Sequence, residues 1–210
     1  MAEQDDALVA ALEGARDVQE GCTALFDYLR ARGTSRYDEA VTQLEHALQS
    51  AMAARRSKAP AAEVTAALLH DIGHLLIDEH DQSGDFLARD LLHEQVGADQ
   101  LTPFFDRTVL EPIRLHVAAK RYLCTTDERY HDALSPASQR SYALQGGAMT
   151  PDEVAAFKRS PGHAAAVRLR RWDDGAKVAG LEVPDLEEFR AAVEACLRMS
   201  GRWSDHPRRG

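Results

Sequence analysis

The sequence has few cysteines, no excess of positive charge and no long apolar run. Its three cysteines, Cys22, Cys124 and Cys196, are far apart and form no Cys-x-x-Cys pattern, which argues against a disulfide framework or a thiolate metal site. The 25 basic and 34 acidic residues give a formal net charge of -9, which argues against a nucleic-acid binder. No apolar run approaches the roughly 20 residues of a membrane span, and the acidic N-terminus lacks a signal-peptide pattern. We therefore expect a soluble cytoplasmic protein with neither a membrane nor a nucleic-acid partner.

The alternation of polar and apolar residues that marks a half-buried strand is also missing. Apolar residues instead recur at three- and four-residue steps, and the helix-favouring residues Ala, Leu, Glu and Arg are abundant. We predict an all-α helical bundle with helices at about 16–32, 42–56, 60–76, 90–101, 108–121, 136–144, 151–159, 161–178 and 185–199. At 210 residues the chain fits one large domain that needs no disulfide or structural metal to fold. We expect residues 200–210 to form a frayed tail.

A histidine-aspartate pair lies in the most apolar of these segments. His70 and Asp71 are adjacent in LLHDIGH, and His74 follows four residues after His70. Residues four apart share one helix face, so we expect His70 and His74 to face the same cavity. Asp71 lies about 100° around the helix, close enough to reach the same metal, and its two oxygens can bridge two metals. An isolated pair of this kind is often a surface or capping pair, but a buried unpaired charge is costly, so a divalent cation is the predicted partner.

Further candidate ligands lie in other predicted helices: His46, His93, His116 and Asp173. Each of these histidines alone would more often be a hydrogen-bonded core residue. With His70 and Asp71, however, the set offers four imidazoles and two carboxylates, a mixture that favours iron or manganese over copper. Six ligands exceed the four of a structural zinc site and suffice for two metals that keep positions for substrate and oxygen. The histidines in polar or terminal contexts are predicted to be surface residues: His80, His131, His163 and His206.

A histidine, a His-Asp pair and a distant aspartate in this order resemble the signature of the HD superfamily, whose members are mostly metal-dependent phosphohydrolases. The added His93 and His116 resemble the mixed-valent di-iron branch that includes myo-inositol oxygenase. Beyond these ligands, the segments similar to organophosphonate oxygenases are QLEHALQSA, AALLHDIGHLL, EPIRLHVAAKRYLC, LSPAS, LQGG and RLRRWDD…AK. The resemblance covers about residues 36–190. It implies an HD-domain bundle around two iron ions, Fe2+ and Fe3+.

The resemblance also implies roles for individual residues. One iron would be held by His46, His70, Asp71 and Asp173. Asp71 would bridge to a second iron held by His93 and His116. The residues implied in catalysis are Asp71, His74 and Lys120, and those implied in binding the phosphonate are His74, Lys120, Ser138 and Arg170.

The positions of the two basic residues, Lys120 and Arg170, are compatible with these roles. Lys120 lies four residues after His116 and Arg170 lies three residues before Asp173, so each shares a helix face with a candidate ligand. Both would otherwise be expected on a solvated face. An acidic protein that binds an anion needs such local positive charge.

One departure from the family pattern concerns the residues before the first ligand. Relatives of this kind often carry a tyrosine there that covers the second iron until substrate arrives, and a glutamate three residues later. Ungapped counting places Arg36 at the tyrosine position and Glu39, a candidate substrate-binding residue, at the glutamate, with Tyr37 adjacent to Arg36. A quaternary ammonium prefers an aromatic or acidic surrounding, so an N-methylated substrate is an open alternative to a free amine.

The resemblance implies an oxygenase that uses O2 to cleave the C–P bond of 2-amino-1-hydroxyethylphosphonate, giving phosphate and glycine, or of its N-methylated form, giving glycine betaine. The alternative is an HD phosphohydrolase, in which a metal activates water and His93 and His116 are not needed. A third possibility is a non-catalytic helical module without metal. For the oxygenase, the expected partners are a small organophosphonate and O2, and the expected state is a monomer.

Overall fold

The computed structural model describes residues 6–36, 41–77 and 92–198. Within these ranges the chain is helical and contains no strand, only an isolated bridge between Arg36 and Thr42. The elements in chain order are α1 (Ala7–Gly14), α2 (Val18–Arg32), α3 (Gln43–Arg56), α4 (Ala61–Leu69), α5 (Ile72–Leu76), α6 (His93–Leu101), α7 (Arg107–Thr126), α8 (Glu128–Asp132), α9 (Pro136–Leu144), α10 (Pro151–Arg159), α11 (His163–Asp174), the 3-10 helix η2 (Leu186–Phe189) and α12 (Arg190–Cys196). The predicted all-α fold is confirmed.

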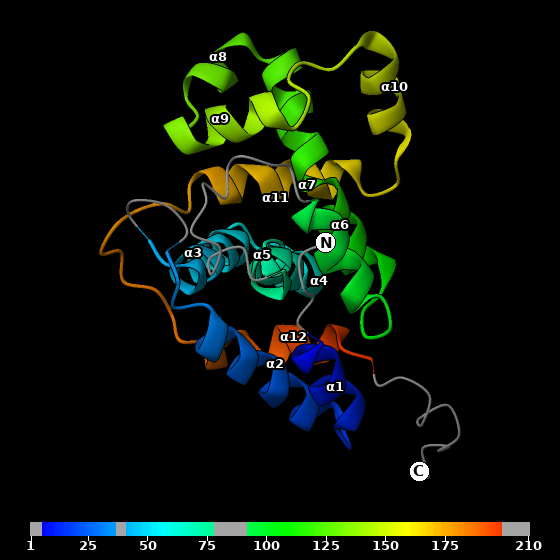
Figure 1. Cartoon of the computed structure of the whole chain (residues 1–210), viewed down its shortest axis with the longest axis vertical. Helices are drawn as coiled ribbons and strands as arrows, with labels where there is room; N and C mark the ends of the chain where they lie inside the picture. The colour runs from blue at the N-terminus through cyan, green and yellow to red at the C-terminus, as the bar shows by residue number, and fades with distance from the viewer. Residues whose placement is uncertain (1–5, 37–40, 78–91, 199–210) are drawn as a thin grey trace.

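The helices are arranged in three tiers (Figure 1). The lower tier contains α1, α2 and α12, the central tier contains α3 to α6 with α11 crossing above them, and the upper tier contains α8, α9 and α10. The 20-residue helix α7 connects the central and upper tiers and packs against α4, α6 and α11. None of the described helices combines the length and the apolar content of a membrane-spanning segment.

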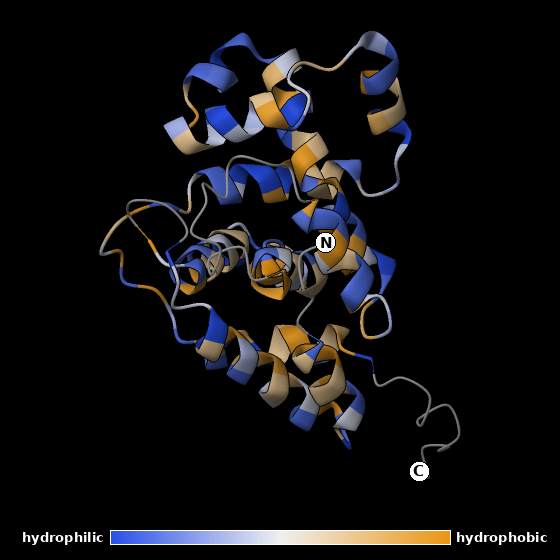
Figure 2. Ribbon diagram, viewed as in Figure 1, coloured by the Kyte–Doolittle hydropathy of each residue, from blue (hydrophilic) through white to orange (hydrophobic). Residues whose placement is uncertain are grey.

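Two hydrophobic clusters stabilise this arrangement. The larger one fills the lower and central tiers, and Figure 2 shows hydrophobic residues where α1, α2 and α12 meet. The smaller one joins α7, α10 and α11 and consists of Ala119, Met149, Phe157 and Ala166. The buried polar residues His116 and Lys120 follow the α7 segment that belongs to the larger cluster. Helix α7 thus continues from the hydrophobic core into a region with buried polar side chains.

Several helix ends are set by local sequence signals. Gly33 ends α2, as predicted, and Thr42 caps α3 through a capping box with Glu45. Pro136 and Pro151 are the first residues of α9 and α10, where a missing N–H costs nothing. The predicted ranges of these two helices agree with the structure at both ends.

The continuous helix predicted for 60–76 is wrong at its centre. Helix α4 ends at Leu69 and α5 begins at Ile72, because Asp71 has backbone angles of φ -102° and ψ 12°, outside the α-helical region. Successive side chains on an unbroken helix diverge by about 100°. The break releases His70 and Asp71 from that constraint, and both point toward the same centre.

Other predicted helix boundaries differ from those of the structure by several residues. Helix α11 ends at Asp174 rather than 178 because Gly175 follows it, and the segment predicted at 185–199 begins as η2 and becomes α-helical only at Arg190. The short helices α1 and α8 were not predicted, and α7 extends beyond residue 121 to Thr126. Part of the helix predicted at 90–101 lies outside the described residues, which resume at Leu92 with a left-handed φ of 55°.

Candidate metal centre

The six predicted metal ligands converge in the middle of the bundle, although they are far apart in the chain. They come from α3, the α4–α5 junction, α6, α7 and α11, and they are His46, His70, Asp71, His93, His116 and Asp173. All six are buried. Their imidazole and carboxylate atoms form two groups, which we call the first half and the second half of the centre.

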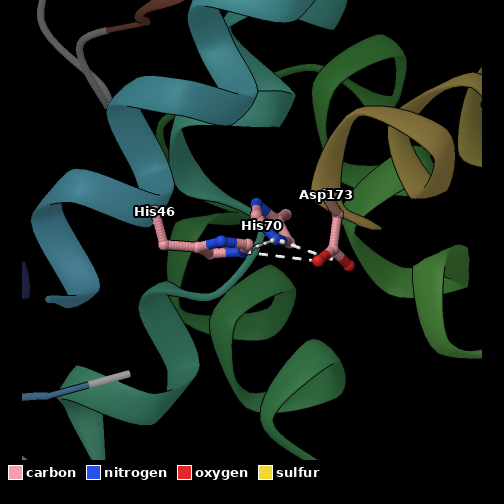
Figure 3. Close-up of side chains that lie close together, drawn as sticks. All are labelled: His46, His70 and Asp173. Carbon is pink, nitrogen blue, oxygen red and sulfur yellow. Dashed lines mark hydrogen bonds and ion pairs between the residues drawn. The ribbon is translucent and has the colours of Figure 1, made fainter. Parts of the chain in front are cut away.

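The first half consists of His46, His70 and Asp173 (Figure 3). The Nε2 atoms of His46 and His70 are 3.1 Å apart. Asp173 Oδ1 lies 3.4 Å from Nε2 of His46, and Asp173 Oδ2 lies 3.8 Å from Nε2 of His70. These three side chains are at most 1% exposed. One small cation fits among their ligand atoms.

The second half consists of His93 and His116, with His74 beside them. The Nε2 atoms of His93 and His116 are also 3.1 Å apart. The ring of His74 stacks on that of His93, with ring centroids 3.8 Å apart and an interplanar angle of 20°. A second pair of imidazoles thus repeats the geometry of the first.

Asp71 joins the two halves, with one carboxylate oxygen in each. Its Oδ2 lies 3.4 Å from Nε2 of both His46 and His70. Its Oδ1 lies 3.4 Å from Nε2 of His93 and 3.5 Å from Nε2 of His116. This is the arrangement of a carboxylate that bridges two metal ions.

His74 lies in a different place from the one predicted. We expected it to share a cavity face with His70, but the break at residues 70–71 turns α5, and His74 belongs to the second half. Its Nε2 lies 4.0 Å from Oδ1 of Asp71. Its side chain is 14% exposed, more than that of any of the six predicted ligands. A small molecule that approaches the second half would therefore pass close to His74.

Main-chain carbonyls fix the orientation of three of the imidazoles. The Nδ1–H groups donate to carbonyl oxygens at 2.7–2.9 Å, in the pairs His46 to Ala176, His70 to Ala67 and His116 to Ile113. An Nδ1 that donates a proton leaves Nε2 as a lone pair, so these lone pairs point toward the centre. Two such lone pairs 3.1 Å apart repel each other unless a cation lies between them.

The carboxylates show the same need for a cation. Asp71 Oδ2 and Asp173 Oδ1 are buried and accept no hydrogen bond from the part of the chain that the structure describes. A buried carboxylate oxygen without a donor is expensive, and a metal ion satisfies it. Four imidazoles and two carboxylates, one of them shared, therefore fit two metal ions of the harder, iron-like class.

The protonation states also suit metal binding. Burial lowers the pKa of His70 and of His116, so both rings are held neutral. Burial alone would raise the pKa of Asp71, but His70 together with contacts from His46 and His93 holds it well below its usual range. Burial is likewise outweighed at Asp173, where Arg170 is the main cause of the lowered pKa. Neutral imidazole and ionised carboxylate are the forms that ligate metals.

A group of buried cations lies against the first half. Lys120 is 3% exposed and donates to Ser141 Oγ at 2.7 Å. Burial, followed by repulsion from Arg170, lowers the pKa of Lys120 to about 7. Ser138 is also buried and accepts a hydrogen bond from Lys177 at 2.9 Å. The predicted phosphonate-binding residues Lys120 and Ser138 are thus brought to one turn of α9.

Arg170 is in this group too, but its guanidinium is largely engaged. It contacts Asp173 Oδ2 at 2.7 Å and donates to both carboxylate oxygens of Asp174. Tyr130 donates to the same Asp174 carboxylate. Asp173 and Asp174 keep Arg170 charged, with its pKa well above the usual value despite burial. The guanidinium of Arg170 therefore contacts both Asp173 and Asp174, and its predicted contact with the phosphonate stays a prediction.

The remaining sequence candidates lie apart from the centre or outside the described residues. Glu39, Tyr37, His80 and His206 fall outside the described ranges. Arg36 is exposed at the bridge to Thr42. His131 and His163 are partly exposed and take no part in the cluster.

Lys177, Tyr130 and Asp174 were not among the predicted site residues, although Asp174 and Lys177 lie in the segment RLRRWDD…AK that resembles the organophosphonate oxygenases. Lys177 lies four residues after Asp173, a spacing that would have placed both on one helix face. The helix ends before Lys177, and the loop brings its Nζ to 3.8 Å from Asp173 Oδ1. The partner of Tyr130 depends on a tertiary contact that no local pattern records, whereas Asp174 lies four residues after Arg170 on α11, a spacing that places the two on one helix face.

Comparison with known proteins is consistent with this geometry. The HD domain family matches residues 43–155. A hydroxymethylphosphonate dioxygenase of Gimesia maris is 60% identical over 86% of this chain and 90% of that protein. A [1-hydroxy-2-(trimethylamino)ethyl]phosphonate dioxygenase (glycine-betaine-forming) of Leisingera caerulea is 41% identical over 78% of this chain and 83% of its own length.

The family match covers more than half of the chain, and both relatives are aligned over most of their length. The matched segment begins at the first residue of α3 and includes His46, His70, Asp71, His93 and His116. A helical HD bundle with a clustered His-Asp centre, in a chain this similar to two phosphonate dioxygenases, is a member of the HD-domain phosphonate oxygenases.

Proposed function

We propose that this oxygenase contains a mixed-valent Fe2+/Fe3+ pair and uses O2 to cleave the C–P bond of a small 1-hydroxyphosphonate. The observation that carries the proposal is Asp71, whose two oxygens each face a pair of imidazoles with Nε2 atoms 3.1 Å apart. One bridging carboxylate with two nitrogens on each side suits two irons, with Asp173 as a further ligand in the first half. The iron pair, when bound, supplies the oxygen activation and redox chemistry that C–P cleavage requires.

The substrate that the higher sequence identity favours is hydroxymethylphosphonate. The relative that acts on it is 60% identical, whereas the relative that acts on the trimethylamino compound is 41% identical. For hydroxymethylphosphonate, the balanced reaction consumes one O2 and yields formate, phosphate and one proton. The family resemblance alone implied 2-amino-1-hydroxyethylphosphonate or its N-methylated form, which would yield glycine or glycine betaine. Those compounds belong in the same substrate panel.

The residues of the chain divide the work between the two ends of the substrate. We assign the reacting end to the second half, beside His93 and His116, where His74 is the most exposed of the clustered histidines. Lys120 and Ser138 then hold the phosphonate, and Arg170 fixes Asp173. Positioning of the substrate by several charged contacts presents one C–H bond to the metal pair and lowers the entropic part of the barrier.

The test is to load the purified protein with iron and to follow O2 uptake and phosphate release with each phosphonate of the panel. We expect one phosphate per O2 and two irons per chain. Anaerobic electron paramagnetic resonance and Mössbauer spectra should show the mixed-valent pair and its perturbation by the substrate. Phosphate release that continues without O2 would replace the oxygenase proposal with HD-type phosphohydrolysis.

A pair of variants separates these two chemistries further. His93→Ala removes one imidazole of the second half and is expected to abolish O2-dependent release, whereas a hydrolase that uses only the first half would keep its activity. His46→Ala is the matched variant in the first half and is expected to abolish both activities. Retention of O2-coupled phosphate release in His93→Ala would contradict a two-iron centre.

The single-domain organisation, the monomeric state and the cytoplasmic location remain predictions of the sequence.

A further inference from the structure

The imidazole of His46 is contacted on both of its nitrogens by one short segment at the end of α11. Asp173 Oδ1 lies 3.4 Å from Nε2 of His46 (Figure 3), and the Ala176 carbonyl accepts from Nδ1 of the same ring at 2.8 Å. The position of residues 173–176 therefore decides how this ring faces the first half.

The acceptor of His46 is unlike those of the two other imidazoles that donate to a main-chain carbonyl. His70 and His116 each donate to the residue three positions earlier, at 2.9 and 2.7 Å, so the adjoining helical turn itself places their acceptors. Ala176 is 130 residues away from His46 in the chain and follows the last turn of α11. Its carbonyl has to be placed by tertiary contacts.

Gln49 supplies such a contact from α3. Its buried side chain lies three residues after His46 and thus on the same helix face. The amide Nε2–H donates to the Val178 carbonyl at 2.9 Å, and the amide oxygen accepts from the Val178 N–H at 3.0 Å. The contacts form a closed ring that runs from His46 through Ala176 and Val178 back to α3.

The segment is held at two ends, of which Gln49 holds the second. At the first end, the N–H of Ala176 donates to the Asp173 carbonyl at 3.0 Å and ties the segment to α11. Val178 is 50% exposed, so burial of its side chain contributes little to fixing the second end. Gly180 follows with a left-handed φ of 67° and adds backbone freedom. The paired hydrogen bonds of Gln49 restrain the main chain where side-chain packing does not.

The hydrogen bond from Nδ1 decides which nitrogen of His46 can ligate a metal. A ring that donates from Nδ1 keeps a lone pair on Nε2. If the Ala176 carbonyl moved away, the proton could lie on Nε2 instead, because Asp71 Oδ2 and Asp173 Oδ1 are both 3.4 Å from that atom. A neutral ring in that form has no lone pair on Nε2 for a metal ion.

We propose that Gln49 is a positioning residue of the metal centre, which holds the Ala176 carbonyl against His46 and thereby sets this ring for ligation in the first half. This inference rests on the proposed function only for the presence of metal ions in the centre, and not for the reaction. The competing explanation is that Gln49 only stabilises the fold, in which case its loss would weaken metal binding in both halves alike.

The experiment follows individual imidazoles in the zinc-loaded protein, because zinc is diamagnetic and accepts imidazole and carboxylate ligands. Zinc bound at Nε2 leaves the proton on Nδ1, and the chemical shift and solvent exchange of this proton in 1H–15N spectra report its hydrogen bond. His70 and His116 are internal references, since their acceptors lie within the adjoining helical turn. Competition with a chelator gives the zinc affinity, and the imidazole signals assign it to each half.

Three variants are compared with wild type. Gln49→Met removes both hydrogen bonds to Val178 at nearly unchanged side-chain length. Gln49→Glu keeps an oxygen that can accept from the Val178 N–H. Gln139→Met is the matched control, because the amide of Gln139 also donates to a main-chain carbonyl, that of His131 at 3.3 Å, and neither residue is a ligand of the centre.

We expect Gln49→Met to move the His46 Nδ1 proton upfield and to speed its exchange, while the His70 and His116 protons keep their wild-type shifts. Zinc affinity should fall about 10-fold in the first half, at the lower end of the range for residues that support a ligand. It should stay within about twofold of wild type in the second half. Gln49→Glu should lie between wild type and Gln49→Met, and Gln139→Met should match wild type.

Several outcomes would overturn the assignment of Gln49. They are an unchanged His46 proton in Gln49→Met, equal losses of zinc affinity in both halves, and equal effects of Gln49→Met and Gln49→Glu. If Gln49→Met does not fold, Gln49→Glu carries the same comparison, with a selective but smaller change at His46 expected. A uniform change of all three imidazoles in that variant would count against the positioning role.

Failure of the proposed function gives a different result. Phosphate release that is independent of O2 in the iron-loaded wild type would refute the oxygenase and leave the assignment of Gln49 in place, because the zinc measurement involves no turnover. A wild type in which zinc does not bind at His46 would overturn the assignment itself. With iron, Gln49→Met should lower kcat by more than it raises KM for hydroxymethylphosphonate, since the substrate is assigned to the second half.

Discussion

The two halves of the metal centre are built in different ways. In the first half, His46 and His70 are fully buried and each donates its Nδ1–H to a main-chain carbonyl, and Asp173 is held by Arg170. In the second half, His93 is 7% exposed and is the first residue of α6, directly after the left-handed residue Leu92. The first half is thus supported from the hydrophobic core, whereas one side of the second half depends on how α6 meets α5.

This difference indicates which half of the centre can bind an incoming molecule. A site whose donors are fixed by main-chain hydrogen bonds resists change. A site whose histidine His93 stacks on His74, a side chain that is 14% exposed, admits an incoming molecule with little rearrangement. We therefore expect substitutions in the first half to act mainly through metal retention and those in the second half to act on substrate and turnover as well.

The largest effect is expected at Asp71, which contributes a carboxylate oxygen to each half. Asp71→Asn keeps the size of the side chain but removes the negative charge shared by the two ions. Both irons should be lost or bound far more weakly, by more than the roughly 10- to 100-fold typical of residues that only support a ligand. Iron per chain and O2-dependent phosphate release are the measurements.

Asp132→Asn is the matched control for this substitution, because the Asp132 side chain is 86% exposed on α8, away from the centre. It should retain iron and activity. Two tightly bound irons in Asp71→Asn would show that the halves are independent sites and would end the comparison between them.

The next largest effect is expected where α5 meets α6. A Cβ at Gly73 would lie 2.0 Å from the carbonyl oxygen of His93 and 2.7 Å from its carbonyl carbon, so the backbone of α6 would have to move. Gly73→Ala should reduce the free energy of unfolding by about 1–3 kcal/mol, as overpacking does, and should lower iron occupancy in the second half before the first.

Denaturant unfolding of the metal-free protein and iron titration measure these two effects separately. Gly14→Ala is the control, because a Cβ at Gly14 meets nothing within 4 Å. It should be neutral or slightly stabilising. An unchanged second half in Gly73→Ala would mean that His93 is not positioned by the contact between α5 and α6.

Much of the centre was predictable because histidine and aspartate side chains stand out as candidate metal ligands when they occur in apolar helical segments. His46, His93 and His116 were identified from their apolar helical neighbours, and all three lie in the cluster. Helices with clear end signals, such as α9 and α10, were predicted with their bounds. In both cases the residues that allow the prediction lie within a few positions of the predicted ligand or helix end.

What could not be predicted depends on contacts between distant segments. The break at residues 70–71 places His74 in the second half, although an unbroken helix would have aligned it with His70. The loop that carries Lys177 to Ser138 and the contact of Tyr130 with Asp174 bring together residues that periodicity does not relate. These features belong to the substrate side of the centre, where tertiary structure decides the chemistry.

A smaller effect is expected from the support of the first half. Tyr130 donates to Asp174, which accepts from Arg170, and Arg170 in turn contacts Asp173. Tyr130→Phe removes one hydrogen bond to a charged group, which contributes about 1.5–3 kcal/mol to stability. We expect a loss near the lower end of that range, with a several-fold weaker affinity for iron in the first half only.

Unfolding and iron titration of Tyr130→Phe measure these changes, and Tyr142→Phe, a partly buried tyrosine on α9, is the control. Equal weakening of both halves in Tyr130→Phe would contradict separate support for the first half.

The last effect is a pH dependence that Lys120 contributes. Lys120 lies on α7, four residues after the second-half ligand His116, and its Nζ donates to Ser141 Oγ on α9, next to Ser138, where the phosphonate is proposed to bind. Its pKa is lowered to about 7, chiefly by burial, whereas the unfolded chain has the ordinary value of 10.5. Above pH 7 the folded chain therefore binds fewer protons than the unfolded chain, and by linkage this residue makes the folding stability of the metal-free protein increase with pH between about 7 and 10.5.

Anion binding should change in the opposite direction, because loss of the Lys120 charge above pH 7 weakens the contact with a phosphonate. Affinity for inorganic phosphate should fall by at most about tenfold per pH unit above 7, the limit for one proton. Lys120→Met should lose this slope and start from a lower affinity. Calorimetric titrations between pH 7 and 9 measure both, and an identical slope in wild type and Lys120→Met would assign the pH dependence to another group.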